Sequence, residues 1–108
     1  MSEHVQVATS TDSRANAERI ARTLVEAQLA ACVQVLGPIA STYRWQGKIE
    51  TAEEWLCLAK TRAELYARVE EAIRAVHPYE LPEILAIPIA AGSQSYLDWM
   101  DQQTEHQA

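Results

Sequence analysis

The segment from His77 to Glu83 (HPYELPE) holds the densest group of side chains capable of chemistry, with one imidazole, one phenol and two carboxylates. Copper and zinc both accept neutral imidazole and carboxylate ligands, which makes His77 and Glu80 candidate metal ligands. A single histidine is too few for a complete site. The same residues fit a rigid connector, stiffened by two prolines, in which Tyr79 packs and the carboxylates pair with Lys60 or an arginine. From residue chemistry alone we favour the connector.

Two cysteines offer a second type of ligand. Cys32 begins an apolar stretch, and a thiolate there would bind soft Cu(I). Free cysteine is also among the most buried residue types, so we prefer a core position for Cys32 and, more strongly, for Cys57 between two leucines. The two do not form the CxxC pair of redox and zinc motifs. The other histidines, His4 and His106, lie near the chain ends, where we expect solvated side chains.

Motifs and composition exclude several classes of function. The sequence contains no Gly-rich phosphate loop, no HExxH motif and no Gly-x-Ser-x-Gly elbow, so nothing in it supports an enzyme. Nine Lys and Arg against fifteen Asp and Glu give a net charge of −6, which disfavours binding to nucleic acid. The longest apolar runs, such as residues 84–91, are too short to span a membrane, and the N-terminus shows no secretory signal. We expect a cytoplasmic protein with one domain, residues 1–108.

The candidate residues must be positioned by elements that the apolar pattern predicts. Residues 5–9 alternate as a short strand, and residues 10–13 supply successive candidate N-caps for a helix. Apolar residues from Ala17 onward follow helical spacing, and we expect this first helix to end near Leu29.

Residues 32–45 and 48–60 are predicted to form a long hairpin. The turn lies at residues 46–47, because Gly47 tolerates the positive φ that a two-residue turn needs. A Gly-Pro pair at residues 37–38 breaks or bulges the first of these strands.

The hairpin also predicts where the two thiols lie. It places Cys32 opposite Thr61 and Cys57 opposite Leu36, or one residue away if the bulge shifts the register. The thiols would then be roughly 13 Å apart along the strands, beyond the reach of a disulfide. An intramolecular disulfide is therefore not expected.

The second half of the chain repeats the pattern of a helix followed by a strand. The sequence TRAE at residues 61–64 has the form of a capping box and predicts a helix start, while Pro78 predicts its end. Residues 84–90 form the last predicted strand, at a sheet edge because Pro88 cannot donate to a ladder. Residues 96–100 predict a short C-terminal helix.

The resulting order, β-α-β-β-α-β with a final helix, predicts an α+β fold of the ferredoxin-like split β-α-β type, a two-layer sandwich with a long central hairpin. Its two central strands have about 14 residues each, against the usual ~5–6. Their tips, with Tyr43, Trp45 and Trp55, should project past the core. Exposed aromatic residues there indicate an interface between copies, together with the edge strand. The alternative is that these aromatics are merely exposed, or that the strands are shorter.

Several ordered motifs stand together: LAACV at residues 29–33, STYRWQGKI at 41–49, KT at 60–61, HPYELPE at 77–83 and YLDW at 96–99. In them the sequence resembles the CutA1 family, the divalent-cation tolerance proteins, from about residue 5 to residue 100. The resemblance implies a tight homotrimer formed by strand pairing between subunits, similar in architecture to the PII signalling proteins. It also implies a part in tolerance of copper and other divalent metals, with no agreed enzymatic activity.

The resemblance also suggests a ligand set. Copper-binding members are attributed a cysteine near the end of the first strand and a His-His pair before Pro-Tyr. Here those positions read Ala8 and Val76-His77, so only His77 carries over. Glu80, Cys32 or a neighbouring subunit would have to complete the site. Our leading hypothesis is a metal-tolerance homotrimer that binds copper or a similar divalent cation weakly through these residues.

Two alternatives belong to other classes of function. The first is a PII-like sensor whose clefts between subunits bind a small anionic metabolite near Lys60, Arg44 and Tyr79. The second is a structural trimer without a ligand.

Overall fold

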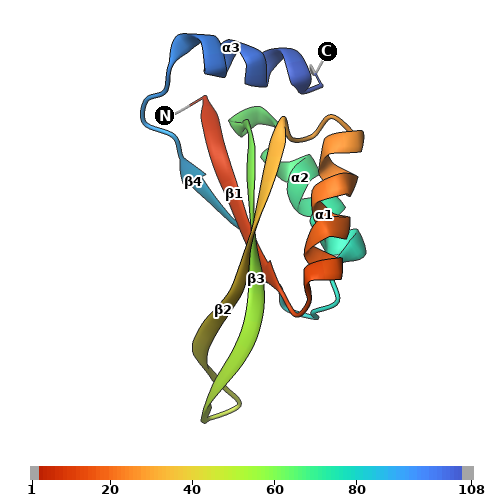
Figure 1. The fold of residues 1–108 in the computed structure, drawn as a ribbon, viewed down its shortest axis with the longest axis vertical. Coiled ribbons are helices and arrows are strands. Elements are labelled where there is room, and N and C mark those ends of the chain that lie inside the picture. The colour runs from red at the N-terminus through yellow and green to blue at the C-terminus, as the bar shows by residue number, and fades with distance from the viewer. Residues whose placement is uncertain (1–2, 106–108) are drawn as a thin grey trace.

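Four antiparallel strands form one sheet in the computed structural model, which describes residues 3–105 (Figure 1). The strand order is β2-β3-β1-β4, so the last strand lies at an edge, as Pro88 predicts. This arrangement confirms the predicted ferredoxin-like α+β class. The elements follow the chain as β1 (His4–Thr11), α1 (Arg14–Glu26), β2 (Cys32–Trp45), β3 (Lys48–Arg62), a 3-10 turn η1 (Ala63–Leu65), α2 (Tyr66–Val76), β4 (Leu85–Pro88) and α3 (Gln94–Gln103).

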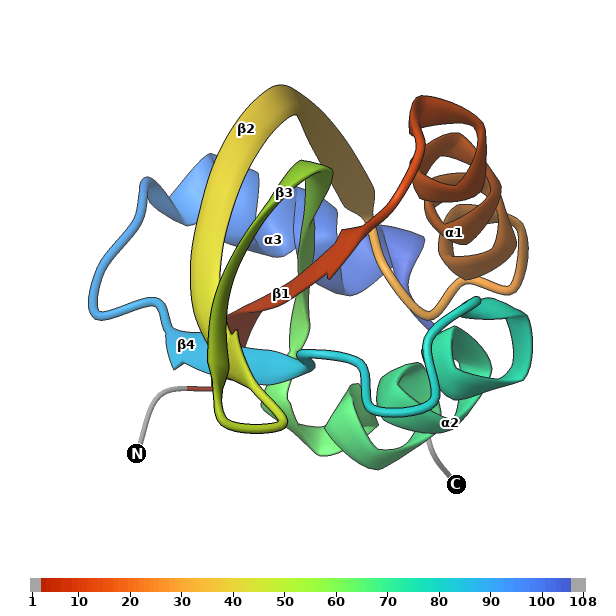
Figure 2. The same cartoon turned by 90° about the horizontal axis from the view of Figure 1, so that it is seen from below.

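Both long helices cover the same face of the sheet. Figure 2 shows α1 and α2 side by side on one side, while α3 crosses the end of the sheet opposite the hairpin tip in Figure 1. Alternate residues of β1 and β3 point toward α1 and α2, because side chains in a strand alternate between faces. The resulting core consists of Val5, Val7, Ala17, Ile20, Leu24, Leu29, Ala30, Cys57, Ala59, Leu65, Val69 and Ile73.

The start of α1 follows the predicted capping, but its end does not follow the apolar pattern. Ser13 is the N-cap, and its hydroxyl accepts a hydrogen bond from the Asn16 N–H at 3.1 Å. The helix stops at Glu26 because Gln28 takes a positive φ of 58° and turns the chain. The predicted end near Leu29 is wrong because Leu29 is buried in the turn and not on the helix.

The predicted capping box at residues 61–64 is also wrong. Thr61 is the second-last residue of β3, and its buried hydroxyl donates to the Leu29 carbonyl at 2.6 Å. The Glu64 carboxylate pairs with Arg62 instead of with the backbone. The chain therefore passes through η1 before α2 begins at Tyr66, since both capping side chains have partners elsewhere.

The hairpin of β2 and β3 extends the molecule to 44 Å in its longest dimension, against 25 and 22 Å in the others. Gln46 and Gly47 form the turn with φ angles of 50° and 79°, as the two-residue turn requires. Pairing is regular from Trp45 back to Ile39 and then shifts by one residue across the bulge before Leu36. We call the part beyond this bulge, residues 39–54, the hairpin arm.

The bulge decides which residues face the cysteines. Cys32 lies opposite Lys60 and Cys57 opposite Val35, one residue from the pairing predicted without a shift. Both thiols are free. They lie on opposite faces of the sheet, because Cys57 belongs to the helix-covered core and Cys32 is three ladder positions from Val35.

Two further expectations about the hairpin need correction. β2 is an edge strand and not a central one, because β3 separates it from β1. Trp55 does not project with Tyr43 and Trp45, since it packs partly buried against the core. Its ring lies against Gly37 so closely that a Cβ at Gly37 would be 2.4 Å from Trp55 Cδ1.

Candidate functional site

His77 lies where α2 ends and the linker to β4 begins. Its backbone is extended, with φ −79° and ψ 135°, as expected for a residue before proline. The half-buried imidazole places Nε2 at 2.9 Å from the Ser10 carbonyl oxygen, and Nδ1 accepts a hydrogen bond from the Tyr79 N–H at 3.1 Å. Because a carbonyl oxygen only accepts, Nε2 must donate to it, which assigns the Nε2–H tautomer. Both ring nitrogens are therefore engaged.

Tyr79 continues this network to the hairpin. Its hydroxyl donates to Glu54 Oε2 at 2.7 Å, and its ring centroid lies 4.9 Å from that of His77. Burial raises the pKa of the Tyr79 phenol well above its usual range, and the hydrogen bond to Glu54 and the negative charges of Glu54 and Asp12 raise it further. The phenol therefore remains a hydrogen-bond donor. We call the series from the Ser10 carbonyl through His77 and Tyr79 to Glu54 the polar chain.

The other predicted metal ligands lie apart from His77. Glu80 is exposed on the linker. Cys32 lies opposite Lys60, whereas Ser10, the partner of His77, lies opposite Leu56 on the same strand. Four residues along β3 correspond to roughly 13 Å. The structure therefore does not bring Cys32 to His77.

Cys32 has a different neighbour. Burial raises the pKa of Tyr96 on α3, and the adjacent Cys32 thiol raises it further. Within residues 3–105 no group of three or more His, Cys, Asp or Glu side chains could hold a metal ion. The described residues of one chain thus do not fit a preassembled metal site.

The residues of the alternative cleft are also separated. Arg44 lies near the hairpin tip opposite Ile49, while Lys60 donates to Gln34 Oε1 at the other end of the hairpin. Ile49 and Lys60 are eleven residue steps apart along β3, which corresponds to roughly 36 Å. Tyr79, the third residue, donates a hydrogen bond to Glu54, which lies on β3 between Ile49 and Lys60. A single chain does not gather these three side chains around one ligand.

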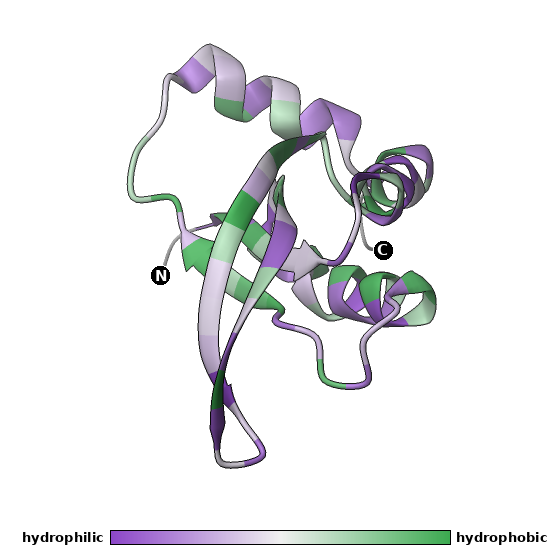
Figure 3. Cartoon of the chain, turned by 60° about the horizontal axis from the view of Figure 1, so that its bottom comes forward, coloured by the Kyte–Doolittle hydropathy of each residue, from purple (hydrophilic) through white to green (hydrophobic). Residues whose placement is uncertain are grey.

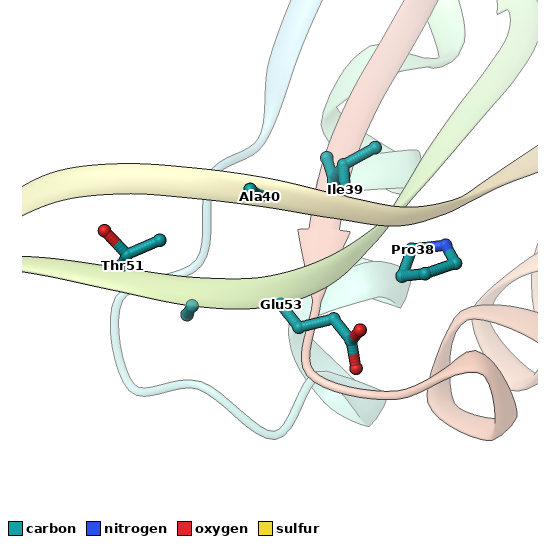
Figure 4. A pocket seen from close by; sticks show the side chains of 6 residues that line it. Pro38, Ile39, Ala40, Thr51 and Glu53 are labelled. Carbon is teal, nitrogen blue, oxygen red and sulfur yellow. The ribbon is translucent and has the colours of Figure 1, made fainter.

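One hollow of about 330 Å³ lies on the hairpin arm (Figure 4). It borders the bulge, and both strands of the arm contribute to it. Among its lining residues only Thr51 and Glu53 carry polar side chains. The hollow therefore lacks the convergent donors that a small anion needs; its lining consists of Pro38, Ile39, Ala40, Thr51, Ala52 and Glu53.

A second polar junction, missed by the sequence reasoning, fixes α3. His4 was expected to be solvated, but it belongs to β1, its side chain is only 12% exposed and its Nε2 lies 2.8 Å from Asp101 Oδ1. The buried Arg62 donates to Thr104 Oγ1 at 2.9 Å and to the Glu105 carbonyl. No local pattern marks contacts between residues 97 positions apart. His106, the other histidine near a terminus, lies outside the described residues.

Comparison with known proteins places these features in a family. The family model described as CutA1 divalent ion tolerance protein matches residues 5–103. The chain belongs to the CutA1 family. The divalent-cation tolerance protein CutA of Thermus thermophilus is 46% identical over 88 residues, which are 82% of this chain and 85% of that protein. The resemblance seen in the sequence motifs is thereby confirmed.

Solved structures of the family share the fold. CutA1 from Oryza sativa superposes with a TM-score of 0.95 at 33% identity and covers 98% of this chain and 97% of its own. The protein described as periplasmic divalent cation tolerance protein CutA, from Archaeoglobus fulgidus, has a TM-score of 0.92 at 44% identity, over 94% of this chain and 99% of its own.

The names of the Thermus thermophilus and Archaeoglobus fulgidus proteins describe divalent-cation tolerance, and none of these three relatives carries an enzymatic designation. Others describe chloroplastic proteins, so a cytoplasmic location stays a prediction. In the described part of this chain, no helix has both the length and the apolar character to cross a membrane.

Proposed function

We propose that the protein acts in divalent-cation tolerance as a non-enzymatic, cytoplasmic homotrimer that binds cations weakly. Family membership supports the general role. The observation that best supports assembly into oligomers is that the sheet face opposite α1 and α2 has exposed apolar side chains. We call it the open face.

The open face is formed by the strand positions that alternate with the core. Leu85 and Ile87 of β4 pair with Ala8 and Gln6, which alternate with the core residues of β1. Figure 3 shows apolar segments of β2 and β4 on the side away from α1 and α2. The exposed fractions of the apolar residues at these strand positions are large: Leu36 46%, Leu85 56% and Ile87 46%. On α3, Tyr96 and Trp99 are each 39% exposed. Small monomers seldom leave contiguous patches of this kind in water.

Further copies of the chain are the occupants that best match this surface. β2 is an edge strand, and the backbone groups on its outer side are available for pairing with a strand of another copy. Tyr43 and Trp45 on the hairpin arm are 41% and 44% exposed, as an interface between copies requires of its aromatic residues. A chain of 108 residues also buries too little of its own surface to be very stable alone. Three copies follow from the resemblance to the CutA1 trimer.

Weak cation binding follows from charge and from the separated candidate ligands. Each chain carries −6, so three chains carry −18, and such a particle attracts cations in general. One chain offers no preassembled group of three ligands among its described residues. Any contribution of His77, Glu80 and Cys32 as ligands would therefore need groups from neighbouring copies.

Sedimentation and calorimetry test the two parts separately. We expect a species of about three times the 12.1 kDa chain mass at micromolar concentration, and a monomer there would refute the assembly. We expect Cu(II) to bind the tag-free protein with a Kd weaker than about 10 µM, or a free energy less favourable than roughly −7 kcal/mol. A Mg(II) titration measures nonspecific attraction. Tight stoichiometric Cu(II) binding would contradict the weak mode.

A further inference from the structure

We infer that His77 is a positioning residue and not a metal ligand: it holds the linker between α2 and β4 so that Tyr79 reaches Glu54 and fixes the base of the hairpin arm. The consequence for assembly rests on the homotrimer proposed above. The hydrogen bonds that support the inference do not depend on it.

The imidazole has no free coordination position. A metal binds through a nitrogen lone pair, and the single lone pair of this tautomer, on Nδ1, is directed at the Tyr79 N–H at 3.1 Å. Nε2 carries the proton donated to the Ser10 carbonyl at 2.9 Å. A metal at either nitrogen would therefore replace an existing hydrogen bond.

The position of Tyr79 depends on this imidazole. Pro78 has no N–H, so the Tyr79 N–H is the first backbone donor after His77. Its hydrogen bond to Nδ1, with the ring contact at 4.9 Å, fixes the direction of the linker. That direction brings the phenol to Glu54, 25 residues earlier in the chain.

Glu54 lies where the hairpin arm leaves the rest of the sheet. It pairs with Ile39, the first paired residue of β2 beyond the register shift. Only 7% of Glu54 is exposed, and no ion pair among residues 3–105 includes its carboxylate. A buried carboxylate requires hydrogen-bond donors, and the Tyr79 hydroxyl supplies one at 2.7 Å. The polar chain thus joins the end of β1 to the base of the arm through His77.

Three substitutions of His77 separate positioning from coordination. His77→Asn retains an acceptor near Nδ1, His77→Gln retains a donor near Nε2, and His77→Ala retains neither. All three remove the imidazole. The readouts on the full chain are hydrogen exchange of the Tyr79 amide and the Cu(II) titration.

We expect the Tyr79 amide to exchange roughly tenfold faster in His77→Gln and His77→Ala, because the loss of one hydrogen bond has about this effect. It should remain near the wild-type rate in His77→Asn, and Cu(II) heats should not change in any of the three. Loss of Cu(II) binding in all three variants, or unchanged Tyr79 protection in His77→Gln, would overturn the inference. Glu83→Gln, at another exposed position of the same linker, is the matched control and should alter neither readout.

A double-substitution cycle tests whether His77 acts through Tyr79. Tyr79→Phe removes only the hydroxyl that reaches Glu54, and we expect faster exchange of the amides of residues 52–56. In that background His77→Gln should add no further acceleration at the arm base, whereas additive effects would show that His77 does not act through Tyr79. These measurements test contacts within one chain. Their outcome therefore does not depend on whether the wild type sediments as a trimer or as a monomer, and the inference can be refuted without refuting the proposed assembly.

Discussion

On one face of the sheet, α1 and α2 cover Val5 and Val7 almost completely, whereas on the other face Leu85 and Ile87 remain 56% and 46% exposed. Both faces arise from the same alternation of side chains along β1 and its neighbours. Among the described residues α1 and α2 cover only the first face, and α3 contacts the second at one end, through His4 and Asp101. In our proposal further copies cover the second face, so substitutions on the two faces should have different consequences.

The largest effect is expected from a charge on the open face. Ile87→Asp places a carboxylate in the proposed interface, and burying an unpaired charge costs several kcal/mol. We expect the variant to sediment as a monomer at micromolar concentration while its far-UV circular dichroism is retained.

Val25→Asp is the matched control for this substitution. Val25 is 44% exposed, close to the 46% of Ile87, but it lies on α1 and not on the open face. It should assemble like the wild type. Equal loss of assembly in both variants would show that the open face has no special role.

A substitution that creates a cavity beneath the helices should lower the stability of the chain without affecting assembly. Ile20 on α1 is fully buried, and Ile20→Ala is expected to lower the free energy of unfolding by about 2–5 kcal/mol. Denaturant unfolding at several protein concentrations measures this loss. It should be the same at each concentration, while the loss in Ile87→Asp should vary with concentration. A concentration-dependent loss in Ile20→Ala would erase the distinction between the faces.

The two thiols extend the comparison to chemical reactivity. Cys57 lies on the covered face with its Sγ at 3.5 Å from the Ala17 carbonyl oxygen, and burial raises the pKa of this thiol from 9.0 to about 11. At pH 8 its thiolate fraction is roughly a hundredfold below that of an ordinary cysteine. In a Cys32→Ser variant we therefore expect labelling of native Cys57 to be limited by unfolding.

The same shift gives a pH dependence. Because the folded-state pKa of Cys57 is raised, the stabilisation from its buried neutral thiol is complete below pH 9 and is lost as the pH rises through about 11. Unfolding midpoints of the wild type and Cys57→Ala between pH 8 and 11 measure the effect. A parallel decline in both proteins would assign the loss to other groups.

The smallest effect is expected at the junction that fixes α3. His4→Asn removes the contact to Asp101, because the shorter amide does not reach the position of Nε2, and since Asp101 is 43% exposed we expect a cost of only about 0.5–1 kcal/mol. Hydrogen exchange of the α3 amides should increase. Arg22→Gln, which breaks an exposed helix pair with Glu26, is the control and should not change exchange in α3.

Several parts of the fold were predictable because they depend on neighbouring residues. Gly47 and the strands around it predicted the hairpin turn, and Pro88 predicted the edge position of β4. The Gly-Pro pair at residues 37–38 predicted a bulge. It did not predict which residues pair with Cys32 and Cys57, because strands with and without a one-residue shift have the same local sequence pattern.

The candidate site was predictable as a segment but not as a set of contacts. The sequence identified His77 and Tyr79 as residues of a stiff linker. It did not identify Glu54 as the partner of Tyr79 or the Ser10 carbonyl as the partner of His77, because both contacts join residues far apart in the chain. Thr61 shows the same limit, since a buried carbonyl took the hydroxyl that the capping pattern assigned to its own helix.

The sequence by itself determined the order of elements, the overlong hairpin and the family, because periodicity, turn residues and ordered motifs are properties of local stretches of chain. The tertiary structure alone decided that both nitrogens of His77 are occupied, that Cys32 lies apart from it and that one sheet face stays open. These outcomes depend on which distant groups come together, and a buried polar group binds the nearest partner that folding provides.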